Sequence, residues 1–327
     1  MPFDEFNSVN VVRRVPRGAL PTYSITADIL AYKTCPRQYG FFSHRGYIPA
    51  HNIQLWFGTI VHQVLEKLHL QYKGYLDPNR RGQLPTDADV EFFFNQVNES
   101  LRIRGIKSYS RTLDRDGDEQ HALRILKQFC SIEGATLFPN IKDTEYRFQN
   151  HQHNYILQGV VDVLRDISGE HIPEGYHPLE IWDYKAAKNP QYQPNNPQNQ
   201  RKLRNYRFQL LVYAYLYHLK TGHYPKKGVL YFVNELSNRE IPHPTPNQIE
   251  EMRRKAIFSI DFTNPENLRE IHTALLEFNQ TVEEIERCKR DERWCAPNAE
   301  NLPDEDTCTT CDSRWDCTQR DYELRYP

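Results

Sequence analysis

Four cysteines could share one metal centre, although they come from the two ends of the chain. Cys35 stands alone near the N-terminus, whereas Cys308, Cys311 and Cys317 follow the spacing Cys-x2-Cys-x5-Cys near the C-terminus. Thiolates at short, uneven spacings bind soft metals. A ligand recruited from the other end of the chain would fix the two ends together. The pattern therefore predicts a metal centre that joins the N-terminal and C-terminal segments.

The other three cysteines call for different interpretations. The total of seven is odd, which argues against a disulfide framework. Cys130 follows the helical pattern of Leu123, Leu126 and Phe129, which indicates core packing, and Cys288 is also interpreted as a plain thiol. Cys295 leaves an alternative open, in which a local zinc module of an interaction protein takes its four ligands from Cys295, Cys308, Cys311 and Cys317.

Two apolar extended segments carry acids and a lysine that could hydrolyse phosphodiester bonds. Asp162 ends the run from Gly159, and Asp183 and Lys185 flank Tyr184. Strand alternation places Asp183 and Lys185 on one face. If the strands are neighbours, Asp162 and Asp183 converge on a divalent cation, with the Tyr184 carbonyl as a further oxygen ligand, and such hard ligands suit Mg²⁺ or Mn²⁺. Lys185 could then orient the attacking water and offset charge on the phosphate.

A histidine is a further candidate ligand for the same cation. His62 lies within an apolar helical pattern that begins at Trp56, and it shares one helix face with Glu66. By itself such a histidine is ordinarily a packed or surface residue. It becomes a credible ligand once the two acids are accepted as a metal site.

The elements that would position these residues alternate between helix and strand. A short helix from Thr26 ends at Cys35 before Pro36, and helical patterns also cover 56–68, 87–135, 208–219 and 245–290. The segments 143–148, 155–165, 178–185 and 228–234 are rich in β-branched and aromatic residues and are expected to be strands. The acidic stretch Leu113–Glu119 and the Asn-, Gln- and Pro-rich stretch 189–200 are expected to be loops. This order predicts an α/β fold with a mixed central sheet.

Composition limits the class of protein and of partner. The chain has 327 residues, 39% of them hydrophobic, which is enough to build a core. No apolar run approaches the roughly 20 residues of a membrane span, and the N-terminus lacks an apolar signal region, so we expect a cytoplasmic protein that does not bind membranes. With a net charge of −2, contacts to DNA must come from local patches, such as the one in which Arg201, Lys202, Arg204 and Arg207 alternate with Tyr206 and Phe208.

These residues together resemble the RecB-like branch of the PD-(D/E)XK nucleases, and specifically its iron–sulfur members. Related proteins include CRISPR adaptation nucleases and the nuclease domains of helicase–nuclease repair complexes. Six motifs occur in the order of that family across residues 24–317. They are Cys35-Pro36 with Tyr39, Gly58 with His62, Gly159 with Asp162, Asp183 with Lys185, Gln209 with Tyr213, and the C-terminal cysteine triplet.

The resemblance implies a role for each matching position. His62, Asp162, Asp183 and the Tyr184 carbonyl would bind the catalytic metal, and Lys185 would assist the water. Gln209 and Tyr213 would line the site and contact DNA, and Glu145 matches an acid often found on the preceding strand. Cys35, Cys308, Cys311 and Cys317 would ligate a [4Fe-4S] cluster. The implied fold is a restriction-endonuclease-like sheet flanked by helices, with the cluster as a staple between the terminal segments.

The expected organisation is a flexible arm over residues 1–20 and one nuclease domain over 21–325. That domain would contain a helical insertion at about 70–140 and an iron–sulfur segment at 288–320, and an insertion at Ile167–His177 would separate Asp162 from Asp183 by more than the family's usual distance. No phosphate-binding loop of a helicase is present, so the chain would act alone or with a helicase or CRISPR-adaptation protein.

The expected function is metal-dependent DNA hydrolysis, as an exonuclease on single-stranded DNA or DNA ends, in repair and recombination or in CRISPR spacer acquisition. The alternative is a non-catalytic DNA-binding or scaffolding subunit of a larger nucleic-acid-processing complex. The intact set of Asp162, Asp183 and Lys185 favours the enzyme.

Overall fold

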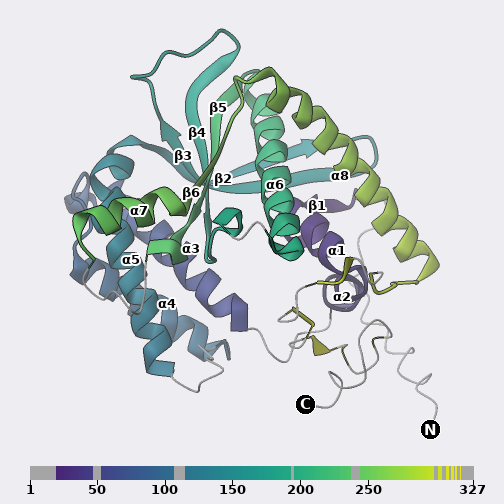
Figure 1. Ribbon diagram of the computed structural model, residues 1–327, viewed down its shortest axis with the longest axis horizontal. Helices are drawn as coiled ribbons and strands as arrows, with labels where there is room; N and C mark the ends of the chain where they lie inside the picture. The colour runs from purple at the N-terminus through teal and green to yellow at the C-terminus, as the bar shows by residue number, and fades with distance from the viewer. Residues whose placement is uncertain are drawn as a thin grey trace. The chain divides into compact units, whose positions relative to one another are not determined.

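The computed structural model divides the chain into two compact units (Figure 1). We call residues 52–148 and 160–274 the core unit, and residues 1–51, 149–159 and 275–327 the terminal unit. The structure describes residues 20–46, 53–106, 115–192, 195–236, 244–297, 301–303, 307–308, 311–312, 314 and 317. The predicted arm over residues 1–20 therefore lies almost wholly outside the described residues, and the predicted single domain over 21–325 stays a prediction.

A mixed sheet forms the centre of the core unit. Antiparallel pairing joins β3 to β4, parallel pairing joins β4 to β5, and antiparallel pairing joins β5 to β6, while β2 pairs with β3. The strands are β2 (Ile141–His151), β3 (Ile156–Asp166), β4 (Tyr176–Lys185), β5 (Tyr224–Phe232) and β6 (Ile257–Asp261). The predicted α/β fold with a mixed central sheet is confirmed.

Three helices pack their apolar faces on one side of this sheet. They are α3 (Ile53–Tyr72), α4 (Asp87–Ile103) and α5 (Arg115–Leu137). Their buried side chains form a single cluster with sheet residues that include Trp182, Tyr184 and Tyr231. Because side chains alternate along a strand, Asp183 and Lys185 are directed to the opposite side.

The opposite side of the sheet is covered by α6 (Pro197–Thr221) (Figure 1). This helix begins at the Asn196 cap with Pro197 in its first turn, and it ends where Gly222 adopts a left-handed conformation with φ of 79°. Gly228 lets α6 approach β5 closely, since a Cβ there would lie 3.2 Å from Leu210 Cδ2 and 2.9 Å from Phe262 Cζ. The close approach brings polar residues of α6 against the face that carries Asp183.

Two further long helices follow in the sequence up to Asp291. The first, α7 (Pro246–Ala256), starts with a capping box between Thr245 and Gln248 and leads directly into β6. The second, α8 (Pro265–Asp291), begins in the core unit and ends in the terminal unit. None of the described helices is both long and apolar enough to cross a membrane.

In the terminal unit, short N-terminal elements pack against the end of α8. Residues Thr22–Ser24 form β1, which pairs in parallel with Ile156–Gln158, and Ala31–Thr34 (α1) and Pro36–Tyr39 (α2) follow. Tyr23 hydrogen-bonds to Glu286 of α8. Trp294 packs so closely on Gly40 that a Cβ there would lie 2.3 Å from the Trp294 Cγ atom. Segments from both ends of the sequence therefore belong to one compact unit.

The predicted strands are all present, but two predicted loops are partly wrong. Helix α5 already begins at Arg115, so the acidic stretch is helical up to Glu119, whereas Leu113 and Asp114 lie outside the described residues. The stretch 189–200 contains a 3₁₀ turn at Pro190–Tyr192 and the first turn of α6, because Asn and Pro are good residues at a helix start even though they cannot build a core. The predicted helical region 245–290 also contains the strand β6.

Candidate active site

The two acids from the sequence pattern come from directly neighbouring strands. Val163 of β3 is paired with Trp182 of β4 in an antiparallel register, and one further step of that register places Asp162 opposite Asp183. Residues opposite each other in an antiparallel pair share one face of the sheet. Both carboxylates are buried, with exposed fractions of 9% for Asp162 and 4% for Asp183. The two strands are therefore neighbours, which was the condition for Asp162 and Asp183 to converge.

Both oxygens of Asp162 are held by residues of the core unit. His62 of α3 places its Nδ1 atom 3.1 Å from Asp162 Oδ1. The backbone N–H of Tyr184 donates to Asp162 Oδ2 over 2.5 Å. Asp162 is therefore fixed from one side by a helix and from the other by the neighbouring strand, so its carboxylate has one defined orientation.

Asp183 belongs to a separate polar network with β4 and α6. Lys185 Nζ lies 2.5 Å from Asp183 Oδ2 and donates to Gln209 Oε1 over 2.8 Å. The Gln209 amide donates to Asp183 Oδ1 and to the Tyr213 hydroxyl, each over 2.9 Å. Gln209 and Tyr213 are both buried. The structure thus brings together all four residues of the predicted Asp-x-Lys and Gln-x-x-x-Tyr motifs.

Burial and mutual charge govern the electrostatics of these groups. Burial raises the pKa of Asp183, and Lys185 opposes that rise only in part. Burial alone would lower the pKa of Lys185, but the attraction of the Asp183 carboxylate outweighs the effect of burial and raises the pKa of Lys185. For His62, burial lowers the pKa, but the Asp162 carboxylate overrides this effect and raises the pKa to about 9. Lys185 and His62 are therefore cations that balance the two acids.

The donor set suits a hard divalent cation. Asp183 Oδ2 is buried and, among the described residues, accepts no hydrogen bond of good geometry, although the Lys185 ammonium lies 2.5 Å away. Oxygen ligands of this kind favour Mg²⁺ or Mn²⁺. Within the described part of the chain, however, no three His, Cys, Asp or Glu side chains are already arranged as a metal site. A cation would require His62 to lose its proton and Lys185 to shift away from Asp183.

Glu145 lies close enough to this site to interact with it. Its backbone adopts φ of 48°, which is uncommon for a residue other than glycine and interrupts the regular geometry of β2. Burial, together with the charges of Asp162 and Glu66, raises the pKa of Glu145 to about 7. The sequence pattern placed an acid near the site, but it could not show this strained backbone.

Two neighbours of the site were not expected in these positions. His69 of α3 is buried, and its Nε2 atom lies 3.3 Å from the Tyr184 hydroxyl oxygen. Burial lowers the pKa of His69 to about 3. The ring of Tyr206 lies 5.2 Å from Lys185 Nζ. Within the basic patch that was expected to contact DNA, Phe208 is only 4% exposed and packs in the interior, so it cannot contact DNA, and its burial agrees with the apolar helical pattern 208–219. Helical periodicity could have signalled His69, which lies two turns after His62.

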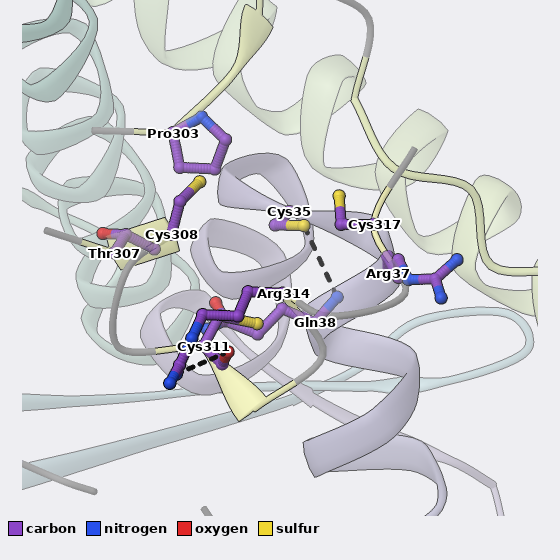
Figure 2. A pocket seen from close by; sticks show the side chains of 9 residues that line it. All are labelled: Cys35, Arg37, Gln38, Pro303, Thr307, Cys308, Cys311, Arg314 and Cys317. Atoms are coloured by element: carbon purple, nitrogen blue, oxygen red, sulfur yellow. Dashed lines mark hydrogen bonds between the residues drawn. The ribbon is translucent and has the colours of Figure 1, made fainter. Parts of the chain in front are cut away.

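The four cysteines of the predicted centre line one pocket in the terminal unit (Figure 2). Cys35 caps α2 and accepts a hydrogen bond from the Gln38 backbone N–H over 3.5 Å. The Cys311 backbone N–H donates to the Cys308 carbonyl, and the Cys317 backbone N–H donates to the Arg314 carbonyl, each over 3.2 Å. Burial raises the pKa of Cys35 to about 11. Cys295, the alternative ligand, is exposed and does not line this pocket.

Comparison with known proteins assigns the family. The family model of the PD-(D/E)XK nuclease superfamily matches residues 26–318, which include every motif described above. The chain belongs to the PD-(D/E)XK nuclease superfamily. Nucleases of this superfamily typically use Mg²⁺ or Mn²⁺, in agreement with the hard donors of Asp162 and Asp183. No curated protein sequence matches this member of the superfamily.

Solved structures show distant similarity to this superfamily member. A crystal structure from Eubacterium rectale, provisionally named as an exonuclease, has 13% sequence identity and a TM-score of 0.40, over 77% of this chain and 81% of the other. The crystal structure of SSO0001 has 14% identity and a TM-score of 0.28, over 88% of this chain and 96% of the other.

The contact between His62 and Asp162 predicts a pH-dependent stability in metal-free protein. Because the folded-state pKa of about 9 exceeds the usual value near 6.5, the stabilisation is complete below about pH 6.5 and is lost as the pH rises through about 9. The melting temperature of His62→Gln should therefore be a few degrees below wild type at pH 6, and this gap should close by about pH 10. Thermal melts in EDTA would measure it.

His171, which is exposed, offers a matched control. The variant His171→Gln should melt close to wild type at every pH. A gap for His62→Gln that stays constant between pH 6 and pH 10 would contradict the ion pair with Asp162.

Proposed function

We propose that this chain is a metal-dependent deoxyribonuclease that hydrolyses phosphodiester bonds at Asp162, Asp183 and Lys185. The observation that carries the proposal is the buried Asp183 carboxylate, which meets the Lys185 ammonium beside a second buried acid, in a member of a nuclease superfamily. A purely structural role gives little reason to bury two acids on facing positions of a sheet.

The cation would be held by Asp162, Asp183, His62 and the Tyr184 carbonyl. When bound, Mg²⁺ or Mn²⁺ supplies an acidified water and neutralises charge on the phosphate. Once shifted away from Asp183, the Lys185 ammonium would still lie beside the site, where it could orient the attacking water and offset the charge that grows on the phosphate. Gln209 fixes the direction of the Lys185 side chain, and Tyr213 fixes Gln209 in turn.

The substrate we propose is single-stranded DNA or a DNA end, cleaved in the manner of an exonuclease. Support comes from the basic side chains at the start of α6, where Lys202 and Arg204 are exposed. Cationic side chains near a site attract the phosphate backbone. The biological setting we propose is DNA repair and recombination or CRISPR spacer acquisition, with a helicase or a CRISPR-adaptation protein as partner.

The cysteine pocket is proposed to hold a [4Fe-4S] cluster through Cys35, Cys308, Cys311 and Cys317. Four thiols around one pocket fit the thiolate ligands that such a cluster requires. The cluster would be structural, since its ligands come from both terminal segments of one unit. Its loss is expected to loosen the terminal unit.

Replacing the buried acid provides the direct test of the nuclease. Asp183→Asn keeps the volume of the side chain but removes the charge that would hold the cation. DNA cleavage should fall by roughly 100-fold or more, because charge stabilisation at the phosphate is lost. The measurement is the degradation of end-labelled single- and double-stranded DNA with Mg²⁺ or Mn²⁺.

The control for this experiment is Asp166→Asn, an acid that lies at the end of β3 and binds Ser168 instead. This variant should cleave at a rate close to that of wild type. Equal cleavage by Asp183→Asn and wild type would refute the site. A folded, metal-supplied wild type that cuts no DNA would favour the scaffolding alternative.

Cysteine replacement separates an iron–sulfur centre from a local zinc module. In protein purified without oxygen, Cys35→Ala should lose most of its iron and its broad visible absorbance, because one of four ligands is removed. Cys295→Ala should keep both. Elemental analysis measures iron and zinc together. Zinc in the wild type, or metal lost from Cys295→Ala and retained by Cys35→Ala, would contradict the iron–sulfur assignment.

A further inference from the structure

One edge of the core sheet gathers residues from four elements around Lys185. Lys185 at the end of β4 pairs with Phe232 at the end of β5, and Tyr231 pairs with Ile257 at the start of β6. Helix α7 ends immediately before Ile257, so Arg254 and Lys255 also lie at this edge. The end of α7 therefore lies at the same edge of the sheet as Lys185, the candidate catalytic lysine.

The segment that leaves β4 at this edge is held by a buried asparagine. Asn189 is 2% exposed. Its backbone N–H donates to Glu235 Oε1 over 2.8 Å, and its side-chain amide donates to the Lys255 carbonyl over 2.8 Å. Its side-chain oxygen accepts from the Gln191 N–H over 3.0 Å. These three contacts fix the 3₁₀ turn Pro190–Tyr192, which the sequence pattern alone assigned to a loop.

The turn presents an aromatic ring to solvent. Tyr192 is 42% exposed, although the neighbouring Pro190 is buried. The Tyr192 hydroxyl donates to the Arg254 carbonyl over 3.5 Å, which ties the side chain to the end of α7. An aromatic ring held in place and exposed loses little conformational entropy when a ligand stacks on it.

Cationic residues belong to the segments that flank this ring in the structure, the end of α7 and the residues that follow β4. Lys188, three residues after Lys185, is 51% exposed in its side chain, and its contact with Glu235 at 3.5 Å is long. Arg254 and Lys255 end α7, although Lys255 also pairs with Glu251. A second ring, that of Tyr206, lies 5.2 Å from Lys185 Nζ. Aromatic rings flanked by cations are the combination that binds single-stranded nucleic acid, since rings stack on bases and cations attract phosphates.

We propose that Tyr192 is the stacking platform for an unpaired base of the DNA strand whose phosphate reaches Lys185. This inference rests on the proposed function and specifies its substrate class. A base pair inside a duplex is stacked on both faces and cannot offer a face to Tyr192, so the platform selects single strands over continuous duplex DNA. Lys188 and Arg254 attract the phosphates on either side of the stacked base.

The test compares the binding of single-stranded and duplex DNA to full-length protein that carries Asp183→Asn, so that the DNA stays intact. Fluorescence anisotropy with an oligothymidine about 20 nucleotides long should show a Kd roughly 5- to 150-fold higher after Tyr192→Ala, the range expected for one lost stacking contact. Tyr192→Phe, which keeps the ring, should stay within about threefold of its parent. Tyr75→Ala removes an even more exposed tyrosine, 71% exposed, and should have no effect.

Duplex binding decides whether the effect is specific. The Kd for a covalently closed duplex, which has no terminal base pair, should change less than about twofold after Tyr192→Ala, because every base in it is stacked on both faces. Unchanged single-strand affinity, or an equal loss for single strand and duplex, would overturn the platform.

Failure of the platform and failure of the nuclease remain distinguishable. In an otherwise unchanged chain, Tyr192→Ala should raise KM for a long single strand and leave the hydrolysis of a strand of stable abasic (tetrahydrofuran) units at the wild-type rate, because that strand has phosphates but no base to stack. If the wild type hydrolyses neither substrate, the proposed function fails. If it hydrolyses both and Tyr192→Ala leaves the KM for the long strand unchanged, the platform alone fails.

Discussion

The architecture of the core unit depends on the burial of two carboxylates on facing positions of an antiparallel strand pair. Charges removed from water are costly unless they are paired and hydrogen-bonded. Asp162 and Asp183 meet this requirement with partners from both sides of the sheet, since His62 comes from α3 and Gln209 comes from α6. The two helix layers therefore do more than cover the sheet. They supply the groups that make its acidic pair tolerable, and those groups set the geometry of the candidate active site.

Helix α3 controls Asp162 by two routes. The first route is the direct contact between His62 and Asp162 Oδ1. The second route runs through Tyr184. His69 contacts the Tyr184 hydroxyl, and the Tyr184 backbone N–H donates to the other oxygen of Asp162. The low pKa of His69 keeps that ring neutral in the apolar cluster. The packing of α3 on the sheet is thus linked to the orientation of the carboxylate. Since the same helix contributes Trp56 and a row of buried aliphatic side chains to the core cluster, changes in that core should reach the site through Asp162.

Much of this site could be predicted from the sequence, because its residues lie on strands whose period of two fixes which side chains share a face. Asp162, Asp183 and Lys185 follow that rule. The unpredicted features depend on tertiary contacts. The turn at Tyr192 is ordered by Asn189, and Glu145 adopts a positive φ within a strand. Local propensity gave no sign of these features, since a stretch of Asn, Gln and Pro lacks the apolar residues from which packing is ordinarily inferred.

The central claim is that the pair of Asp162 and Asp183 binds a catalytic divalent cation. Its most direct test is the binding of Mn²⁺ to metal-stripped protein, followed by electron paramagnetic resonance, in wild type and in Asp162→Asn. Here the cysteine pocket does not interfere, because its soft thiol ligands disfavour Mn²⁺. We expect saturable binding by the wild type and an affinity at least about tenfold weaker after Asp162→Asn, since one charged ligand is lost. Equal Mn²⁺ affinity in the two proteins, or no binding by the wild type, would contradict the claim.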